Sequence, residues 1–521
     1  MDVLSFFLFL MVAACGFVCI FTFSTGINYY DIWDYYEGIF WSEATIKAAA
    51  PINPEYVYFY TLPFAANFIM APFILLFGPT VLANQLGMTA FFLLYLAVSL
   101  YLAGTLYPED RKSRYLFTGL MTMFVYTYVG DNLLHHILMY GIGFVCTIGE
   151  LACIIRIVRQ EKTGRNIVIL SALCLWSALN GFSAALSTFP VLAAFVVIHY
   201  RNHTLFRRDR LMFLPAIMVL TAAGLIVFRY FDSIALSLDQ YSERLLLDTS
   251  AHMVKHLTQT LPADYLLLFH YAPKRTPVFS AEGIFKLMKL GLAVLVAAVP
   301  YFLGRKEKEA QPEQNEEVQQ FLVLTNGFII TICIVQYSLT VSSNHRYLFN
   351  AVLSLFMLSA FRYTEYLRKK ENLLSMLFIT GTVILLSINT VFRTFPAGLK
   401  NRAVYDQLYS VLEQEGLSYG YAFARTWKVL DITSEGKCRV STITADRGAK
   451  ALRIDFDRIY LEELRKPEGA QRFFIIAGSW DTAQNLKYLK GSVAERKVND
   501  LTIYIYDISK WDTMFASEGR P

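Results

Sequence analysis

The chain has 521 residues, of which 55% are hydrophobic, 15% aromatic and 17% charged, and its formal net charge is +5. Soluble proteins carry about 25% charged residues, so this composition excludes an ordinary soluble enzyme and indicates a protein made largely of apolar helices. The positive charge does not indicate a nucleic-acid partner, because most Lys and Arg residues fall in short loops between apolar stretches.

The first apolar stretch, residues 3–23, has about the 20 residues needed to cross the hydrocarbon core of a bilayer. It has neither a basic leading segment nor a small-residue cleavage site. We therefore expect a membrane helix that is retained in the protein, not a cleaved signal peptide.

An acidic and aromatic segment, residues 28–82, follows this helix and begins NYYDIWDYYEGIFW. Asp31, Asp34 and Glu37 are spaced three residues apart, which brings them close together on the surface of a helix. Acids beside hydrocarbon are costly unless they serve a polar site, and such a cluster can bind a divalent cation or take a proton from a hydroxyl. An interfacial helix with its polar face in water fits the same spacing, so both interpretations stay open.

Basic residues alternate along the chain with nearly uncharged loops. The basic loops lie at 111–114, 156–165, 201–210, 305–308 and 362–370. Because positive loops mark the cytoplasmic side, the N-terminus is predicted to be cytoplasmic and the acidic segment to lie outside. Two apolar stretches, 56–77 and 83–104, then lie between the acidic residues 31–37 and the first basic loop. Only one of the two can cross the membrane if the acids are outside and the basic loop is inside. The first contains Pro63 and Pro72, so we expect a helix over 56–77 that lies along the outer surface without crossing.

With the first helix, the pattern predicts about eleven membrane spans. The others are expected at 83–104, 115–130, 136–155, 167–179, 185–199, 212–228, 284–303, 321–338, 347–361 and 373–391. The region 167–199 also fits a shorter re-entrant pair around Asn180-Gly181. These segments, residues 1–391, form the expected transmembrane domain.

The tail, residues 392–521, has a different composition. Apolar residues at helical spacing over 400–415 predict a helix, and the apolar runs 473–478 and 501–508 predict strands. Cys438 is the single cysteine of this tail, which excludes a disulfide framework there. The expected fold class is therefore a polytopic α-helical membrane protein with outer juxtamembrane helices and a small extracytoplasmic α/β domain.

Further polar candidates fall in the turns predicted to lie outside. Asp131 stands at the outer end of a span, where it either serves a polar site or caps a helix that begins at Asn132. His135 and His136 are adjacent and so point in different directions on a helix. They form a weak metal pair.

Positive candidates on the same side are few. Arg346, with His345 beside it, is the basic residue of the short outer loops, and it can grip a phosphate or extend to lipid headgroups. Lys274 and Arg275 lie in a longer outer segment and fit a lipid phosphate.

The order of these parts resembles the GT-C class of integral membrane glycosyltransferases, which includes protein O-mannosyltransferases, the aminoarabinose transferase of lipid A and oligosaccharyltransferase catalytic subunits. In that class an acidic motif follows the first span, where this chain has DIWDYYEGIFW. A second acidic position, here Asp131, follows the third span, and a late outer Arg-Tyr pair matches Arg346-Tyr347. The chain departs from the class in lacking an Asp-Glu dipeptide in the first motif and paired acids in the second.

The resemblance implies transfer of a sugar from a polyprenyl-phosphate-linked donor to a glycan, lipid or protein acceptor, on the outer face of a prokaryotic cell membrane. On this basis the expected general base is Asp34, then Asp31. The expected acceptor or cation site is Asp131, Glu37 and His135. The expected lipid-phosphate contacts are Arg346, Lys274, Arg275 and His345. The expected cofactor, where one is used, is Mg²⁺ or Mn²⁺ bound at Asp31, Asp34 and Asp131.

Two other functions fit the same helices. A transporter or flippase of lipid-linked glycans needs polar residues along the spans, whereas here the acids gather on one side and Glu150 is an exception at mid-depth. This asymmetry favours a one-sided catalyst. A sensor or assembly subunit acting through its tail also stays open.

Overall fold

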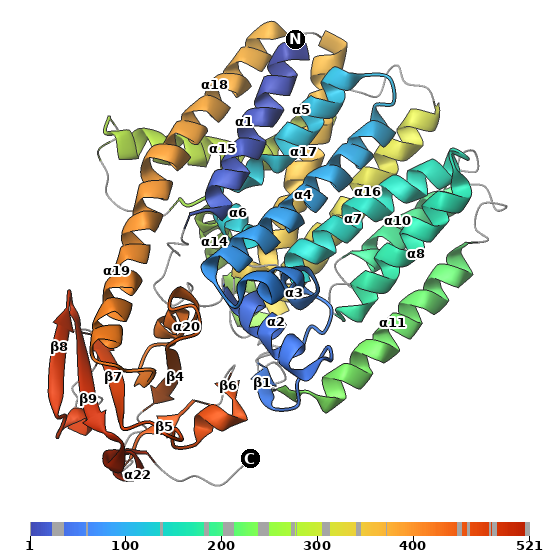
Figure 1. The fold of residues 1–521 in the computed structure, drawn as a ribbon. Coiled ribbons are helices and arrows are strands. Elements are labelled where there is room, and N and C mark those ends of the chain that lie inside the picture. Colours follow the sequence, from blue (N-terminus) through green and yellow to red (C-terminus); the bar gives the residue numbers. More distant parts are fainter. Residues whose placement is uncertain are drawn as a thin grey trace.

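The computed structural model describes most of the chain. The described residues are 2–22, 36–58, 61–135, 139–181, 187–201, 213–237, 250–271, 277, 279–304, 313–339, 345–370, 372–444, 451–455, 459–478, 481 and 487–515. Figure 1 shows a bundle of long helices with a small strand-containing domain at one end. We call residues 415–515 the C-terminal domain, and the end of the bundle at which it lies the domain face.

Among the described residues, seven helices are long and apolar enough to cross a membrane. They are α1 (Asp2–Ile20), α4 (Val81–Leu106), α7 (Met139–Val158), α11 (Leu214–Ile234), α15 (Ala281–Gly304), α16 (Glu313–Leu339) and the continuous helix of α18 (Leu373–Asn389), the π-helical turn Thr390–Thr394 and α19 (Phe395–Gln414). The bundle is completed by α5 (Arg111–Thr122), α8 (Thr163–Leu179), α10 (Thr188–Arg201) and α17 (Phe349–Lys370). Each predicted span overlaps one of these helices, which confirms a polytopic α-helical membrane fold. The count of eleven crossings stays a prediction, because seven of the described helices are long and apolar enough to cross.

The helices divide into a buried centre and an apolar periphery. Within α7, 94% of the membrane-spanning stretch is buried by its neighbours. On α11, by contrast, Met218, Val219 and Ile226 are 63%, 68% and 70% exposed. Large apolar side chains on an outer surface need an apolar solvent, and the periphery of the bundle is therefore the surface that meets lipid.

The helix predicted over 56–77 is wrong in its first half. Tyr56–Tyr58 form a short strand, β1, and α3 runs from Ala66 to Phe77. The aromatic and β-branched run of β1 suits a strand, and α3 is only about 18 Å long at 1.5 Å per residue. That length is too short for a bilayer core of about 30 Å, in agreement with the prediction that this segment does not cross. α3 packs against α2 (Glu37–Ala48) and α4.

The span predicted at 115–130 is wrong at its end. α5 stops at Thr122, a 3₁₀ turn follows, and a short helix, α6, runs over Tyr128–Leu133. Thr127 caps α6, since its hydroxyl accepts a hydrogen bond from the N–H of Gly130 at 3.4 Å. Asp131 is therefore not a helix cap, because it lies inside α6.

The C-terminal domain contains a six-stranded mixed sheet with the order β5-β4-β3-β7-β9-β8. Its strands are β3 (Tyr419–Ala422), β4 (Arg439–Thr444), β5 (Arg453–Ile454), β7 (Arg472–Gly478), β8 (Ala494–Val498) and β9 (Leu501–Asp507). β3, β4 and β7 are parallel, and β9 is antiparallel to β7. The strands predicted at 473–478 and 501–508 are confirmed as β7 and β9.

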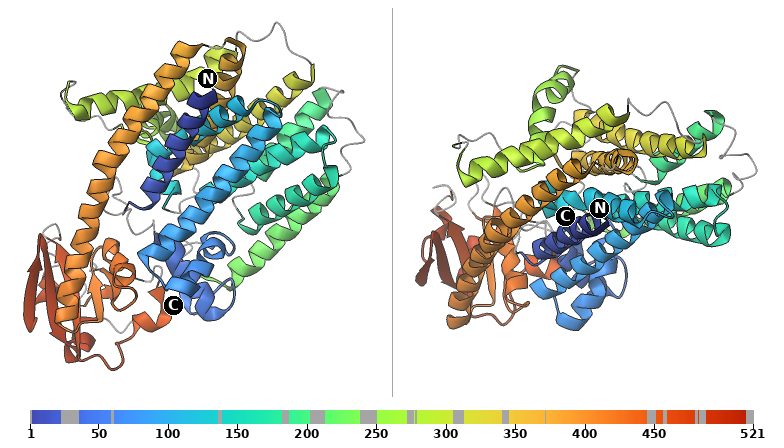
Figure 2. Two further views of the ribbon diagram at one scale, coloured as in Figure 1. Left: turned by 45° about the horizontal axis from the view of Figure 1, so that its top comes forward. Right: turned by 90° about the horizontal axis from the view of Figure 1, so that it is seen from above.

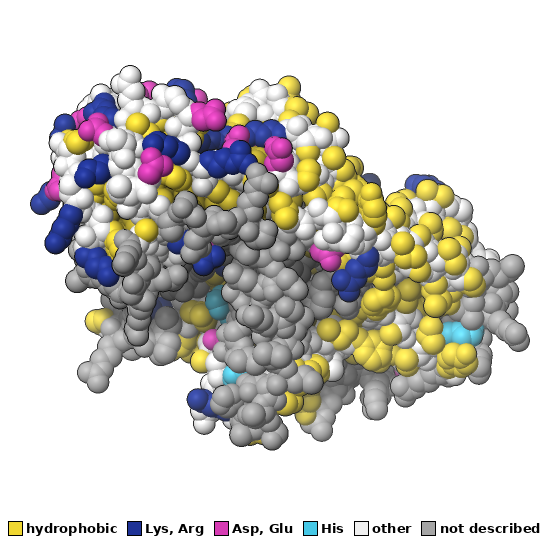
Figure 3. Space-filling view, turned by 90° about the horizontal axis from the view of Figure 1, so that it is seen from below, with side chains coloured by type: hydrophobic (Ala, Val, Ile, Leu, Met, Phe, Trp, Pro, Cys, Tyr) yellow, Lys and Arg dark blue, Asp and Glu magenta, His cyan; other side chains and the backbone are white. Residues whose placement is uncertain are grey.

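A single long helix joins the bundle to this domain. α18 continues through the π-helical turn into α19, which reaches the sheet (Figure 2). The boundary predicted at residue 391 falls inside this helix. Seen from the domain face, Lys, Arg, Asp and Glu side chains are concentrated over the C-terminal domain, whereas hydrophobic side chains dominate the side of the bundle (Figure 3).

Candidate functional site

A polar cavity of about 320 Å³ lies where the end of α1 meets α6, the first turns of α15 and the π-helical turn after α18. The charged residues that line it, among the described residues, are Asp131, Glu282, Lys286, Lys289 and Arg393. Three cations and two acids give the lining a net positive charge even when both acids are ionised. The cavity is therefore suited to an anion.

Helix α15 supplies three of these side chains from one face. Glu282, Lys286 and Lys289 are spaced i, i+4 and i+7, so they line up along the helix surface that faces the cavity. Lys286 pairs with Glu282 at 3.4 Å. Lys289 has no carboxylate within 4 Å among the described residues, although the charge of Asp131 acts on it across the cavity.

Arg393 reaches the cavity from the opposite side. It lies in the π-helical turn Thr390–Thr394 between α18 and α19, and such turns are often found at functional sites. Among the described residues it too has no carboxylate within 4 Å. Lys289 and Arg393 therefore leave two positive charges available to a ligand.

His270, after α14 (Leu261–Leu267), also lines the cavity. Its burial and the nearby charge of Lys289 lower the pKa of His270 well below the usual value, against a backbone hydrogen bond with Thr127 that acts the other way. The ring is therefore neutral near pH 7. Compensation of a bound anion falls to the lysines and Arg393.

The predicted residues Asp131 and His135 lie at the same end of the bundle. Asp131 lines the cavity with its side chain 16% exposed. His135 is buried, and its ring nitrogens lie 2.8 Å from the carbonyl oxygen of Asp131 and 2.9 Å from that of Thr22. Its contacts thus tie the end of α1 to α6.

This tie matters because Thr22 is the last described residue before segment 23–35, which carries the predicted bases. Asp31 and Asp34 lie outside the described residues, and their assignment stays a prediction. Cys19, one turn before Thr22, lines the cavity. The end of α1, after which the sequence continues to both acids, therefore lies beside Asp131.

The remaining predicted residues that the structure describes do not line this cavity. Glu37 is fully buried in the first turn of α2. His345 and Arg346 lie in the 3₁₀ turn His345–Leu348 and are absent from the described lining. The ring of His345 lies 5.2 Å from that of Tyr128, and burial together with Arg346 lowers the pKa of His345 to about 4, against the charge of Asp264. Lys274 and Arg275 lie outside the described residues.

Lys286, Lys289 and Arg393 are not predicted from the sequence. The first two fall inside the stretch 284–303, which was treated as an apolar span, and Arg393 follows the last span by two residues. A signal was present, since all three are positive charges near the span ends predicted to lie on the sparsely charged side. Such exceptions to the charge asymmetry indicate a polar site.

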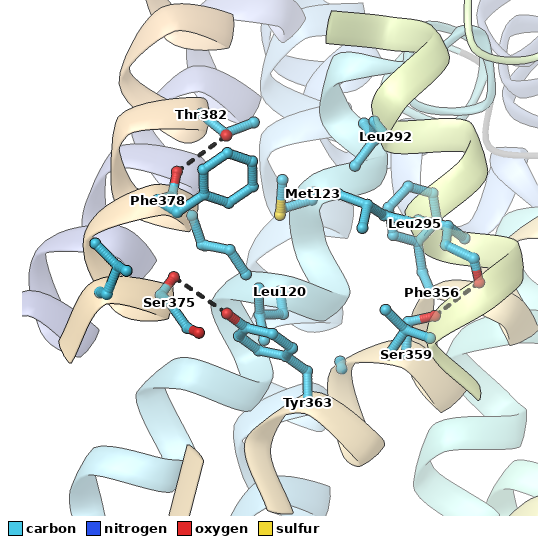
Figure 4. Close-up of a pocket in the computed structure, with 15 residues that line it drawn as sticks. Leu120, Met123, Leu292, Leu295, Phe356, Ser359, Tyr363, Ser375, Phe378 and Thr382 are labelled. Atoms are coloured by element: carbon cyan, nitrogen blue, oxygen red, sulfur yellow. Dashed lines mark hydrogen bonds between the residues drawn. The ribbon is translucent and has the colours of Figure 1, made fainter. Parts of the chain in front are cut away.

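An apolar groove of about 540 Å³ lies deeper in the bundle, between α5, α15, α17 and α18 (Figure 4). Leu292, Leu295 and Phe356 line one side, and Phe378 and Thr382 line the other. The two spaces share helices: on α15 the groove begins one turn after Lys289, and on α18 it ends about two turns before Asn389 of the cavity. The cationic cavity and the apolar groove therefore follow one another along the same two helices.

No family model and no curated protein sequence matches this chain. Among solved structures, the crystal structure of ArnT from Cupriavidus metallidurans bound to undecaprenyl phosphate aligns with a TM-score of 0.56 at 12% identity, covering 96% of this chain and 97% of that one. Its apo structure aligns with a TM-score of 0.55 at 13% identity, with the same coverage. The chain therefore has the fold of ArnT, a GT-C aminoarabinose transferase, as the resemblance in its sequence predicts.

Proposed function

We propose that this protein is a membrane glycosyltransferase that takes a sugar from a polyprenyl-phosphate-linked donor. The observation that carries the proposal is the cationic cavity followed along α15 and α18 by an apolar groove. An isoprenoid phosphate has an anionic phosphate, which suits the cationic cavity, followed by an apolar chain, which suits the groove. The shared fold with ArnT, whose crystal structure contains undecaprenyl phosphate, supports the assignment.

In this proposal the cavity binds the phosphate. Lys289 and Arg393 donate charge-assisted hydrogen bonds to its oxygens, and Lys286 adds positive charge from its pair with Glu282. When the bond between the anomeric carbon and the phosphate oxygen breaks, negative charge grows on that oxygen. Cations already in place stabilise it, because they need no reorganisation as the reaction proceeds.

The acceptor hydroxyl attacks the anomeric carbon and gives up its proton to a base. Asp34 is our first candidate for this base and Asp31 the second, with Asp131 orienting the acceptor from the cavity wall. Glu37 and His135 stay predictions for the acceptor side.

We expect Asp34→Asn to abolish transfer, because an amide cannot take the proton. A general base contributes roughly 100- to 10,000-fold to a rate, so the loss is measurable in a purified system with radiolabelled donor. The variant is expected to insert in the membrane and to bind undecaprenyl phosphate like the wild type. Full activity in both Asp34→Asn and Asp31→Asn would remove the proposed base.

A divalent cation, Mg²⁺ or Mn²⁺, at Asp31, Asp34 and Asp131 also stays a prediction. No group of three or more His, Cys, Asp or Glu side chains suited to a metal occurs among the described residues, and two of the three expected ligands lie outside them. If the cation is used, treatment with EDTA is expected to stop transfer and added Mn²⁺ or Mg²⁺ to restore it. Transfer that continues in EDTA would leave charge compensation to Lys286, Lys289 and Arg393.

We place the domain face outside a prokaryotic cell membrane. The basic loops at 111–114, 156–165 and 362–370 lie at the other end of the helices, and positive loops are retained in the cytoplasm. The sugar would then be transferred on the extracytoplasmic face to a glycan, lipid or protein of the cell envelope.

A further inference from the structure

Three segments distant in sequence form a small sheet at the domain face. Its strand order is β2-β1-β6, where β2 is Leu236–Ser237 and β6 is Ile459–Tyr460. β1 and β6 are antiparallel, with Tyr56 opposite Tyr460 and Val57 opposite Ile459. The C-terminal domain thus adds a strand to the segment between α2 and α3, and Figure 1 shows β1 and β6 side by side.

A second contact joins the C-terminal domain to α2 through charged groups. Arg439, the first residue of β4, donates a hydrogen bond to Glu43 of α2 at 2.8 Å. Arg439 also lies 3.9 Å from Asp431, and Lys428 lies 3.2 Å from Glu463 and 3.9 Å from Asp431. We call these five residues the interface cluster.

The carboxylate of Glu43 is largely shielded from water, and removal of Arg439 therefore has a large effect on it. Glu43 is 8% exposed. Burial alone would raise the pKa of Glu43, but the hydrogen bond and charge of Arg439, together with Lys47, lower it below the usual value. Without Arg439, an ionised Glu43 would be left buried without its strongest partner.

The position of α2 constrains the residues just before it. Asp34 precedes Glu37, the first residue of α2, by three residues, so their Cα atoms are separated by at most roughly 11 Å. The other end of the segment that carries Asp34 is fixed at Thr22 by His135. A movement of α2 would therefore move the chain that bears the candidate base.

We propose that the C-terminal domain clamps α2, and that Arg439 is a positioning residue for sugar transfer because it fixes α2 through Glu43. This inference rests on the proposed function. It gives the C-terminal domain a task in catalysis without placing any of its side chains in the cavity.

If the C-terminal domain clamps α2, loss of Arg439 is expected to lower kcat much more than it weakens donor binding. Both quantities are measured on the full-length protein in nanodiscs. Arg439→Met is expected to lower kcat roughly 10- to 100-fold, since a displacement of about 1 Å can cost that much. The KM for the donor and the affinity for undecaprenyl phosphate are expected to change less than about threefold, because Lys289 and Arg393 are not contacted by the interface cluster. Arg439→Lys, which retains the charge, is expected to recover part of kcat.

Arg496→Met is the matched control. Arg496 lies in the same domain and pairs with Glu415 at 2.6 Å, on strand β8 at the far edge of the sheet. It is expected to retain kcat. Equal kcat in Arg439→Met and Arg496→Met would overturn the clamp.

A disulfide between β1 and β6 tests whether holding the C-terminal domain against this segment is sufficient for turnover. Val57 and Ile459 face each other across β1 and β6, and antiparallel partners have Cα atoms about 4.5 to 5.5 Å apart, within disulfide range. Val57→Cys/Ile459→Cys in the Arg439→Met background is expected to restore kcat on oxidation and to lose it again on reduction. A disulfide that forms without raising kcat contradicts the proposal.

Failure of the clamp can be distinguished from failure of the proposed function. Undecaprenyl-phosphate-linked sugars, aminoarabinose among them, are offered first to the wild-type protein. If none is transferred, amide hydrogen exchange still tests the clamp: residues 37–48 are expected to exchange faster in Arg439→Met than in the wild type or in Arg496→Met. Unchanged exchange would overturn the clamp whatever the protein transfers.

Discussion

Simultaneous replacement of Lys289 and Arg393 by methionine is expected to weaken undecaprenyl phosphate binding by at least about 100-fold. The two cations face one cavity from different helices, and neither has a carboxylate within 4 Å among the described residues. A hydrogen bond to a charged group contributes about 1.5 to 3 kcal/mol, and about 1.4 kcal/mol corresponds to a factor of ten in affinity. Titration of the purified protein with undecaprenyl phosphate measures the loss.

The matched control likewise removes one lysine and one arginine charge, but both come from α19 and lie away from the cavity. Lys400 and Arg402 lie on α19 and do not line it. Their double replacement by methionine is expected to change affinity less than about twofold, since exposed charges at a distance are screened. Lys286→Met is expected to fall between the two, because Glu282 already neutralises part of its charge. Unchanged affinity after loss of Lys289 and Arg393 would show that the phosphate binds elsewhere.

Thr382→Trp is expected to weaken undecaprenyl phosphate binding about 10- to 100-fold while leaving a one-isoprene phosphate unaffected. Thr382 lines the apolar groove (Figure 4), and an indole there would occupy space needed by the lipid chain. Each CH₂ kept out of an apolar site costs about 0.8 kcal/mol, so the displacement of a few such groups accounts for the loss. The two ligands share the phosphate and differ in the tail, and their comparison isolates the groove.

Leu377→Trp provides the control on the same helix. Leu377 is 50% exposed and is not among the described residues that line the groove. It adds the same indole to α18 and is expected to leave both affinities unchanged. Equal weakening of both phosphates by Thr382→Trp would indicate that the substitution disturbs the polar cavity, and would remove the groove as the tail site.

These experiments address a site of which the sequence predicted only part. Asp131 is predicted because it stands alone at the end of a span, and the structure shows that Thr127, not Asp131, caps α6. Lys289 and Arg393 are not predicted to share a site, because one lies inside a predicted span and the other lies just after a different span. Their proximity follows from the packing of α15 beside α18, which no local pattern encodes.

The sequence alone determined the helical membrane fold, the approximate position of the bundle helices and two strands of the C-terminal domain. These features follow from the length and periodicity of apolar runs, because length and periodicity decide whether a segment by itself favours a membrane helix or a strand. The tertiary structure decided which charges share a cavity, where the apolar groove lies and which residues of the C-terminal domain contact α2. Glu43 and Arg439 are separated by 396 residues, and contacts over such distances depend on how the helices and sheet pack together, which the apolar pattern of a single segment does not specify.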